Sequence, residues 1–230
     1  MFETLINNAL KTGAEISACG MAVFYPDKTS LQPAEAQIRL LNKSESISWL
    51  LKGKLYWSAN NKIYISALAK KLKFEGAINE DVLFNFHAFI KAESTVFQDV
   101  IKYKYMVRSN SVSMSKFGPK YMQTIAVSKE IVDFVSKNMP AHLDEAKALD
   151  FSKNISLFNL LLLANRNLYQ KEYDLVLNNL KSYSDFSRNS PYIPRKQRLA
   201  YLALTASPRI YSGLLKLYCS LSNSDVTKRT

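Results

Sequence analysis

Two neighbouring carboxylates, Glu80 and Asp81, are the residues whose types and setting first suggest chemistry. They stand at the start of an amphipathic segment, residues 80–92, whose apolar side chains recur at helical spacing. A carboxylate fixed at a helix start can take a proton from a hydroxyl group held beside it. The structural alternative is that Asn79 caps this helix and the two acids stabilise its first turn. Taken alone, the pair favours that structural role.

Other chemistries have little support among the side chains. His87 falls one turn into the apolar face of the same segment, where a packed or hydrogen-bonded histidine is expected. Cys19 and Cys219 are far apart and lack metal-ligand spacing, which is typical of a reduced cytosolic protein. The sequence has no Ser-His-Asp or Cys-His arrangement and no Gly-rich phosphate loop, and it predicts no metal-binding cluster.

The acidic pair belongs to a series of four short blocks. The blocks are Asn61-Lys62-Ile63-Tyr64, Phe74-Glu75-Gly76, Glu80-Asp81-Val82-Leu83-Phe84-Asn85 and Tyr103-Lys104-Tyr105-Met106-Val107-Arg108-Ser109-Asn110-Ser111-Val112-Ser113. In order and spacing they resemble blocks of the family 2 glycosyltransferases of bacterial polysaccharide and lipooligosaccharide synthesis. That family carries Asn-Lys-Leu-Tyr, Phe-Pro-Glu-Gly and Glu-Asp-x-x-Phe-Asn, then a Tyr-rich strand followed by Arg-x-Asn-Ser-Ile-Ser. The second block here lacks the proline. The resemblance covers residues 1–116 well and the remainder loosely.

This resemblance implies a GT-A fold and transfer of a sugar from a nucleotide-diphosphate donor, usually with inversion. In inverting members, an acid of the Glu-Asp motif takes the proton from the attacking acceptor hydroxyl, which is otherwise a poor nucleophile. Carried over to this chain, the resemblance makes Asp81 the candidate catalytic base. Glu80 would contact the acceptor or orient Asp81. The helix dipole would keep both acids ionised, as a base requires.

Four further residues are candidates for substrate binding. Trp57 and Tyr64 would stack on a sugar ring, because aromatic faces suit the apolar faces of carbohydrates. Core packing is the alternative for both. Lys62 would contact a phosphate or be solvated. Arg108 would reach the donor pyrophosphate or lie at the surface at a strand end.

The donor side of such an enzyme is not recognisable in the chain. Family 2 enzymes begin with strand-helix-strand units that hold the nucleotide. An Asp-x-Asp motif follows for a divalent metal, Mg²⁺ or Mn²⁺, which neutralises charge on the leaving diphosphate. No Asp-x-Asp occurs here, and Met1 falls at the helix, residues 2–12, that follows the motif in the family. We therefore expect the chain to bind no cofactor alone, and a nucleotide sugar only when the missing half is supplied.

The elements that would position these residues change in character along the chain. Up to residue 118, helices are predicted at 2–12, 33–41, 44–51, 66–72 and 80–92. Strands are predicted at 15–19, 21–25, 95–99 and 101–107. Beyond that point only helices are predicted, at 120–138, 154–169, 171–183, 194–205 and 208–221.

We therefore expect an α/β fold class with two parts. Residues 1–118 would form the acceptor-side half of a GT-A domain, and residues 119–230 an all-helical C-terminal extension. Gly13 would end the first helix, and Ser66 would cap the helix at 66–72. Without a donor half, the strands at 15–25 and 95–107 would lack the sheet core with which they normally pair, leaving an uncovered edge.

Composition and charge limit the classes of partner that the protein could bind. The chain has 230 residues, of which 47% are hydrophobic and 22% charged, and a net charge of +12. Nucleic acid is disfavoured because the lysines are dispersed and no RNP motif, zinc-finger spacing or basic zipper occurs. The most apolar stretch, Leu157–Ala164, is too short to cross a membrane, and no leader peptide is recognised. We expect a cytoplasmic protein, with the inner face of the cell membrane as the alternative location.

The C-terminal region is the part best suited to a membrane surface. From Arg188 onward, cationic residues are interleaved with apolar ones, and Asp225 is the single acid. This composition is typical of helices that rest on anionic lipid. The alternative is a solvated basic face on a packed helix.

Three classes of function follow from these observations. The first is a glycosyltransferase, truncated or split, that acts on a glycan or lipid-linked acceptor. The second is a non-catalytic remnant or binding module that recognises a glycan or a partner protein. The third is a basic peripheral membrane or nucleic-acid-binding protein without sugar chemistry, against which the four ordered blocks argue.

Overall fold

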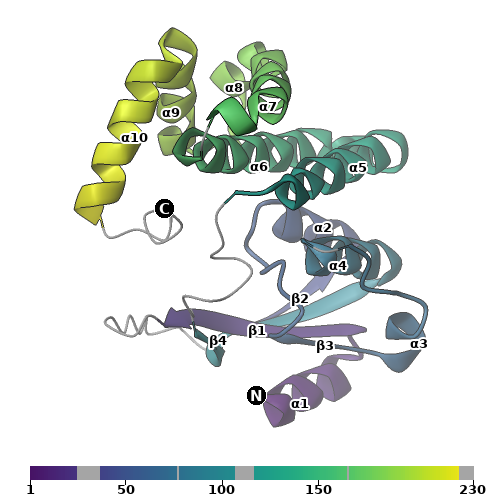
Figure 1. Ribbon diagram of the computed structural model, residues 1–230. Helices are drawn as coiled ribbons and strands as arrows, with labels where there is room; N and C mark the ends of the chain where they lie inside the picture. The colour runs from purple at the N-terminus through teal and green to yellow at the C-terminus, as the bar shows by residue number, and fades with distance from the viewer. Residues whose placement is uncertain (25–36, 77, 107–116, 165, 223–230) are drawn as a thin grey trace. The chain divides into compact units, whose positions relative to one another are not determined.

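The chain folds as two compact units. The computed structural model describes residues 1–24, 37–76, 78–106, 117–164 and 166–222. Contacts divide the chain into Met1–Arg108 and Ser109–Thr230. The first unit mixes strands and helices, and the described part of the second contains helices only (Figure 1). The protein is therefore α/β in class, as the sequence predicts. The division by contacts falls before the change of composition at Gly118.

A mixed four-stranded sheet forms the centre of the first unit. Its strands are β1 (Ile16–Phe24), β2 (Ile38–Asn42), β3 (Lys62–Tyr64) and β4 (Ser94–Met106). Their order is β2-β4-β1-β3, with β1 and β4 parallel and the two outer strands antiparallel to their neighbours. The first five residues of β1 are buried, as expected for an inner strand covered on both faces.

The central pair of strands corrects one expectation. The strands in the segments 15–25 and 95–107 were expected to lack the sheet core with which they normally pair. In the structure, β1 and β4 pair directly with each other. Each is also one continuous strand where the sequence predicted two. The register of the pair shifts on both sides of Gly20, and the extra residues of this bulge belong to β4.

Helices cover both faces of this sheet. Helix α1 (Phe2–Thr12) lies on one face, and α2 (Lys43–Leu51) and α4 (Glu80–Lys91) lie on the other (Figure 1). Gly13 ends α1 as predicted, with a left-handed φ of 70°. The core of the unit is a cluster of buried apolar side chains from the sheet, α2 and α4. It includes Ile16, Ala18, Leu50, Leu55, Ala88, Phe89 and Phe97.

Two local predictions in this unit are wrong. Residues 33–41 were predicted to be helical, but the described part of that segment contains the start of β2. Helix α3 (Ser66–Ala69) is shorter than predicted, and Ile65 rather than Ser66 occupies its N-cap position. In contrast, α2 begins with a capping box in which Asn42 and Glu45 bind each other's backbone N–H.

The second unit is built from α5 (Gln123–Asn138), α6 (Leu143–Leu163), α7 (Gln170–Ser182), α8 (Ser184–Asn189), α9 (Arg195–Ala206) and α10 (Pro208–Ser222). Short 3₁₀ turns lie at Pro119–Met122, Pro140–His142 and Arg166–Leu168. Helix α6 starts well before the predicted residue 154, and α8 was not predicted. In the described ranges, no helix combines the length and apolar character needed to cross a bilayer.

Candidate functional site

Lys62 lies at the centre of a buried hydrogen-bond cluster in the first unit. Only 5% of its surface is exposed. Its Nζ donates to the carbonyl oxygens of Tyr56 (2.5 Å) and Ser58 (2.6 Å) and to Asn61 Oδ1 (2.9 Å). These three acceptors match the three N–H donors of an ammonium group. Lys62 is therefore not solvated, and it fixes the loop that precedes β3.

Asn61 fastens the same loop to the central strand. Its Nδ2 donates to the Cys19 carbonyl, and its own carbonyl accepts from the Cys19 backbone N–H at 3.1 Å. The Cys19 thiol also points at that carbonyl, at 3.5 Å. Asn61 is fully buried, so these bonds replace the hydrogen bonds to water that its side chain and its backbone carbonyl have lost. Burial also raises the pKa of the Cys19 thiol, which disfavours its reactive thiolate form.

Tyr64 and Asn85 connect β3 to α4. The Tyr64 hydroxyl donates to Asn85 Oδ1 at 2.7 Å. Asn85 Nδ2 donates to the carbonyls of Trp57 (2.6 Å) and Asp81 (2.8 Å). Asn85 is fully buried, and these bonds use both of its amide hydrogens and its oxygen. One side chain thus ties the loop, the strand and the first turn of the helix together.

Asp81 lies in the first turn of α4, where its negative charge acts on this cluster. Burial lowers the pKa of Lys62 to about 7, and the charge of Asp81 opposes that change. The same charge adds to burial in raising the pKa of Tyr64. Asp81 and Glu80 are both half-buried. The structure thus brings together three of the residues proposed from the sequence, Asp81, Lys62 and Tyr64.

The start of α4 differs from the simple capping expected for it. Asn79 occupies the N-cap position, but its side chain makes no capping hydrogen bond. Its backbone adopts the left-handed conformation, with φ of 60°. The predicted side-chain cap by Asn79 is therefore wrong, although its backbone carbonyl accepts from the N–H groups of Val82 and Leu83. Glu80 and Asp81 still lie in the first turn of α4, where the helix dipole stabilises their negative charges.

The remaining predicted residues lie as follows. Trp57 is half-buried and packs against the core cluster, as does Tyr64, whose ring also meets Phe84 edge-on at 5.4 Å. Core packing, the stated alternative to sugar stacking, thus explains why the rings of Trp57 and Tyr64 are partly buried. Arg108 lies outside the described residues.

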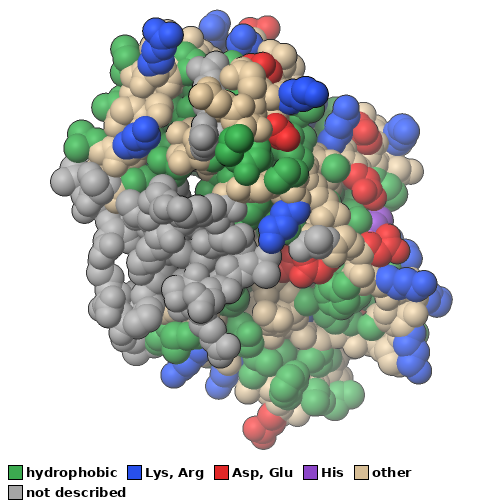
Figure 2. All heavy atoms as spheres, in the orientation of Figure 1, with side chains coloured by type: hydrophobic (Ala, Val, Ile, Leu, Met, Phe, Trp, Pro, Cys, Tyr) green, Lys and Arg blue, Asp and Glu red, His purple; other side chains and the backbone are tan. Residues whose placement is uncertain are grey.

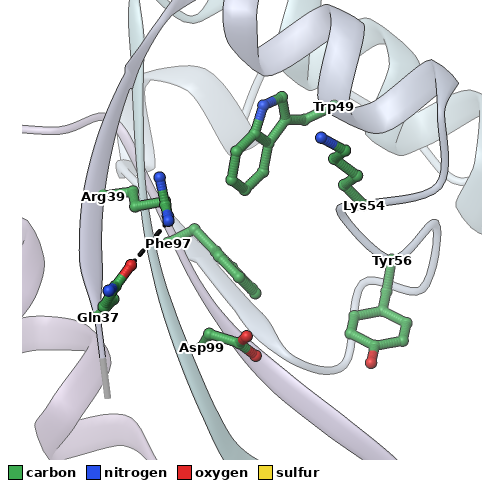
Figure 3. A pocket seen from close by; sticks show the side chains of 7 residues that line it. All are labelled: Gln37, Arg39, Trp49, Lys54, Tyr56, Phe97 and Asp99. Atoms are coloured by element: carbon green, nitrogen blue, oxygen red, sulfur yellow. Dashed lines mark hydrogen bonds between the residues drawn. The ribbon is translucent and has the colours of Figure 1, made fainter. Parts of the chain in front are cut away.

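A pocket of about 500 Å³ opens beside this cluster, in the first unit. Its lining side chains come from β2 and the residue before it, α2, the loop after α2 and β4 (Figure 3). They are Gln37, Arg39, Trp49, Lys54, Tyr56, Phe97 and Asp99. Tyr56 belongs to both sites, because its carbonyl accepts from Lys62 while its ring lines the pocket and its hydroxyl donates to the Met21 carbonyl at 3.0 Å.

Aromatic and charged groups face each other in this pocket. The Trp49 ring meets Phe97 edge-on at 6.1 Å, and the Arg39 guanidinium and Lys54 ammonium lie 5.9 and 5.2 Å from its centroid. Arg39 Nη2 also donates to Gln37 Oε1 at 2.7 Å (Figure 3). Two cations and one acid, Asp99, give the pocket a positive balance. Such a lining suits a polyol that carries an anionic group.

None of the residues that line this pocket was predicted as a site residue from the sequence. Its polar wall depends on Gln37 and Arg39 pointing the same way, which follows from strand alternation. The helix predicted at 33–41 concealed that alternation. On the neighbouring strand, Phe97 and Asp99 alternate in the same way. Phe97 pairs with Arg39, and the Asp99 backbone N–H donates to the Gln37 carbonyl at 3.2 Å.

The family resemblance implies a divalent metal bound through an Asp-x-Asp motif, which this sequence lacks. Among the described residues, no group of three or more His, Cys, Asp or Glu side chains could hold a metal ion. A scan against protein-family models and a search of the curated proteins gave no match to this chain.

Proposed function

We propose that this chain is the acceptor-side part of a glycosyltransferase of GT-A type, with Asp81 as its catalytic base. The observation that carries the proposal is the convergence of separate sequence blocks on one cluster. Tyr64 of one block donates to Asn85 of another, and within the first block Lys62 donates to Asn61. Asp81 stands one helical turn before Asn85, with its carbonyl held by that side chain.

The proposed reaction requires a base that accepts the proton of the acceptor hydroxyl. The Asp81 carboxylate takes the proton of an acceptor hydroxyl as the hydroxyl oxygen bonds to the anomeric carbon of the donor sugar. The bond from that carbon to the diphosphate oxygen breaks, and its electron pair leaves with the nucleotide diphosphate. Lys62, Tyr64 and Asn85 act as positioning residues, because each of them is committed to bonds within the protein.

The pocket beside the cluster provides a place for the acceptor. Trp49 and Tyr56 would contact the apolar faces of sugar rings, and Arg39 and Lys54 would bind an anionic substituent such as a carboxylate or phosphate. Tyr56 connects this pocket to the loop that Lys62 holds. We therefore assign the acceptor to the class of glycans, free or lipid-linked, that carry an anionic group.

The donor nucleotide sugar would be bound by a further polypeptide segment. Two surfaces of the first unit are suited to contact it. Helix α1 exposes Phe2, Ile6 and Leu10 along one side, at 63%, 47% and 79%. Among the described residues, β3 forms one edge of the sheet, where further strands of a GT-A sheet would continue.

Acceptor binding is the first test of this proposal. Neutral and acidic oligosaccharides are titrated into the full-length chain and followed by NMR. We expect acidic glycans to bind, and Trp49→Ala to weaken them about fivefold to tenfold. Tyr192→Ala, which removes an exposed aromatic ring from the second unit, is the control and should bind like the wild type. Equal binding by Trp49→Ala would show that the pocket is not the acceptor site.

Catalysis is tested separately, once the donor-binding segment is in hand. The coding DNA immediately upstream of Met1 is read for an Asp-x-Asp segment, in frame or one base out of frame. With that segment supplied, Asp81→Asn should lower product formation by about 10²- to 10⁴-fold without changing glycan binding. Glycan binding without any transfer, unaffected by Asp81→Asn, would instead favour the second candidate, a non-catalytic glycan-binding module.

A further inference from the structure

Helix α10 exposes an apolar stripe that no described part of the protein covers. Ile210, Leu214 and Leu217 are 65%, 52% and 55% exposed, and Tyr218 is 62% exposed. At about 100° per residue, these side chains share one side of the helix. The neighbouring side of the helix, which carries Tyr211, Leu215 and Cys219, is buried in the second unit.

The buried side shows that α10 is firmly attached to its own unit. Tyr211, Leu215 and Cys219 are each less than one-tenth exposed, and the Tyr211 hydroxyl donates to Asn159 Oδ1 of α6 at 2.8 Å. The exposed stripe is therefore a second apolar side of a docked helix. A helix of this size needs only one apolar side to pack, so the second calls for a separate explanation.

Helix α9, which precedes α10, repeats this arrangement. Tyr201 and Leu204 are buried, while Leu199 and Leu202 are 67% and 46% exposed. The two helices lie next to each other within the second unit (Figure 1). In Figure 2, hydrophobic side chains gather along the outer edge of α10, with Lys and Arg side chains beside them. Exposed apolar residues are thus repeated over both helices.

The charge of this region has one sign. Residues 188–222 contain no Asp or Glu. The same residues contain the cations Arg188, Arg195, Lys196, Arg198, Arg209 and Lys216, which amount to half of the net charge of +12. Arg209 and Lys216 are two turns apart on α10, and both are exposed. Arg198 instead donates to the Ser190 carbonyl and supports the local fold.

We propose that the α9–α10 surface, defined by Leu199, Leu202, Ile210, Leu214, Leu217, Tyr218 and the exposed cations beside them, binds the surface of an anionic lipid bilayer. Apolar side chains would enter the boundary between headgroups and acyl chains while the cations contact anionic headgroups. This proposal does not depend on the proposed function.

Charge decides between a bilayer and the other occupants of such a surface. A second copy of the chain would place the same cations opposite each other, and no acid of residues 188–222 could pair with them. Nucleic acid would satisfy the cations but would leave the leucine and isoleucine side chains in water. An anionic bilayer satisfies both the charge and the apolar stripe.

The experiment is co-sedimentation of the full-length chain with lipid vesicles. Vesicles of phosphatidylcholine alone are compared with vesicles of phosphatidylcholine and phosphatidylglycerol. We expect binding to the anionic vesicles only, and weaker binding as salt is raised. The variants Leu214→Ser/Leu217→Ser and Arg209→Gln/Lys216→Gln should each lower the vesicle affinity about tenfold or more.

Matched changes elsewhere on the second unit serve as controls. Leu168→Ser/Leu175→Ser removes two other exposed leucines, and Lys171→Gln/Lys181→Gln removes two exposed lysines of α7. Both should bind vesicles like the wild type, and circular dichroism checks that every variant is folded.

Three results would overturn the proposal. The first is an absence of vesicle binding by the folded wild type. The second is equal loss of binding in the control variants, which would show that net charge alone attracts the lipid. The third is a dimer in solution that Leu214→Ser/Leu217→Ser abolishes without any vesicle binding, which would assign the surface to a second copy.

Discussion

At the scale of single residues, the cluster around Lys62 is a polar core inside an otherwise apolar unit. A buried ammonium group is costly unless its donors are paired, and here three oxygens accept from it. Asp81 adds a favourable charge from the first turn of α4. The charge of Asp81 and the stability of the fold are therefore linked through this one lysine.

Lys62 should make the stability of the protein depend on pH. Its pKa in the folded chain is about 7, below the ordinary value of 10.5, so the unfolded chain binds more protons between these two values. The free energy of unfolding should rise with pH across this window, by up to about 1.4 kcal/mol per pH unit, and level off outside it. Urea unfolding at several pH values measures this rise.

The reference for that measurement is Lys62→Met, which cannot titrate at this position. The rise that belongs to Lys62 is the difference between the wild type and this variant. Lys70→Met, at an exposed lysine, should keep the wild-type pH dependence. If wild type and Lys62→Met showed parallel profiles from pH 7 to pH 10.5, the buried amine would not titrate as stated.

Asn85 should contribute more to stability than its size suggests. Replacing it with Leu leaves the Trp57 carbonyl and the Tyr64 hydroxyl without their partner in a buried place, at a cost of about 1–3 kcal/mol for each group. We expect Asn85→Leu to lower the free energy of unfolding by about 2–5 kcal/mol in urea titrations.

Asn138→Leu is the matched control for that change. Asn138 also donates to the carbonyl four residues earlier, that of Phe134, but it is exposed on α5. Its replacement should change the free energy of unfolding by less than about 0.5 kcal/mol. Similar losses in the two variants would mean that the local helix bond, and not the buried connection to Trp57 and Tyr64, is what Asn85 contributes.

At the scale of elements, the close approach of β1 and β4 depends on one glycine. A Cβ at Gly20 would lie 2.9 Å from the Val100 carbonyl oxygen and 3.0 Å from its carbon, both of which are backbone atoms. Gly20→Ala must therefore widen the bulge between the two strands, and we expect it to cost about 1–3 kcal/mol in the free energy of unfolding.

Gly118→Ala is the control for the Gly20 prediction. A Cβ at Gly118 meets nothing within 4 Å, and its φ of −152° is open to any residue. Denaturant titration should find this variant as stable as the wild type or slightly more stable, because alanine restricts the unfolded chain. Wild-type stability in Gly20→Ala would show that the bulge accommodates a methyl group without a change of register.

How far the sequence predicts these elements depends on how local their signals are. The helix at 80–91 and the end of α1 at Gly13 were predicted because apolar periodicity and glycine act within a few residues. Strand β2 was not, because its partner β4 lies more than fifty residues away and its pattern is also compatible with a helix. The pocket that uses Arg39 and Trp49 was missed with it.

The site itself was predicted in part. The motif blocks gave Asp81 as the candidate base and Lys62 and Tyr64 as candidate substrate-binding residues, and the structure brings these three together. The blocks gave no indication that Lys62 would be turned inward onto backbone carbonyls, since such a bond depends on the path of the preceding loop. The importance of Asn85 was also hidden, because a buried amide is recognised only by its partners.

At the scale of the whole molecule, the two units differ in the chemistry they carry. The first unit, Met1–Arg108, holds the acidic pair, the Lys62 cluster and the pocket. The second, Ser109–Thr230, holds the α9–α10 surface and the long helix α6. A division of this kind would let one unit recognise a glycan and the other a lipid surface, so each proposal can fail without the other.

The division also predicts how a core defect spreads. Phe158 of α6 is fully buried, with the Tyr173 ring 4.8 Å away, and Phe158→Ala should cost about 3–5 kcal/mol. Because most contacts of each unit lie within it, this loss should open the second unit alone. Hydrogen exchange read by mass spectrometry should therefore speed up in peptides from α5 to α10, while peptides of β1, β4 and α4 keep wild-type protection. The reciprocal variant, Phe89→Ala in the first unit, should give the opposite pattern, since Phe89 is equally buried in the other core. Faster exchange throughout the chain in both variants would mean that the two units unfold as one cooperative body.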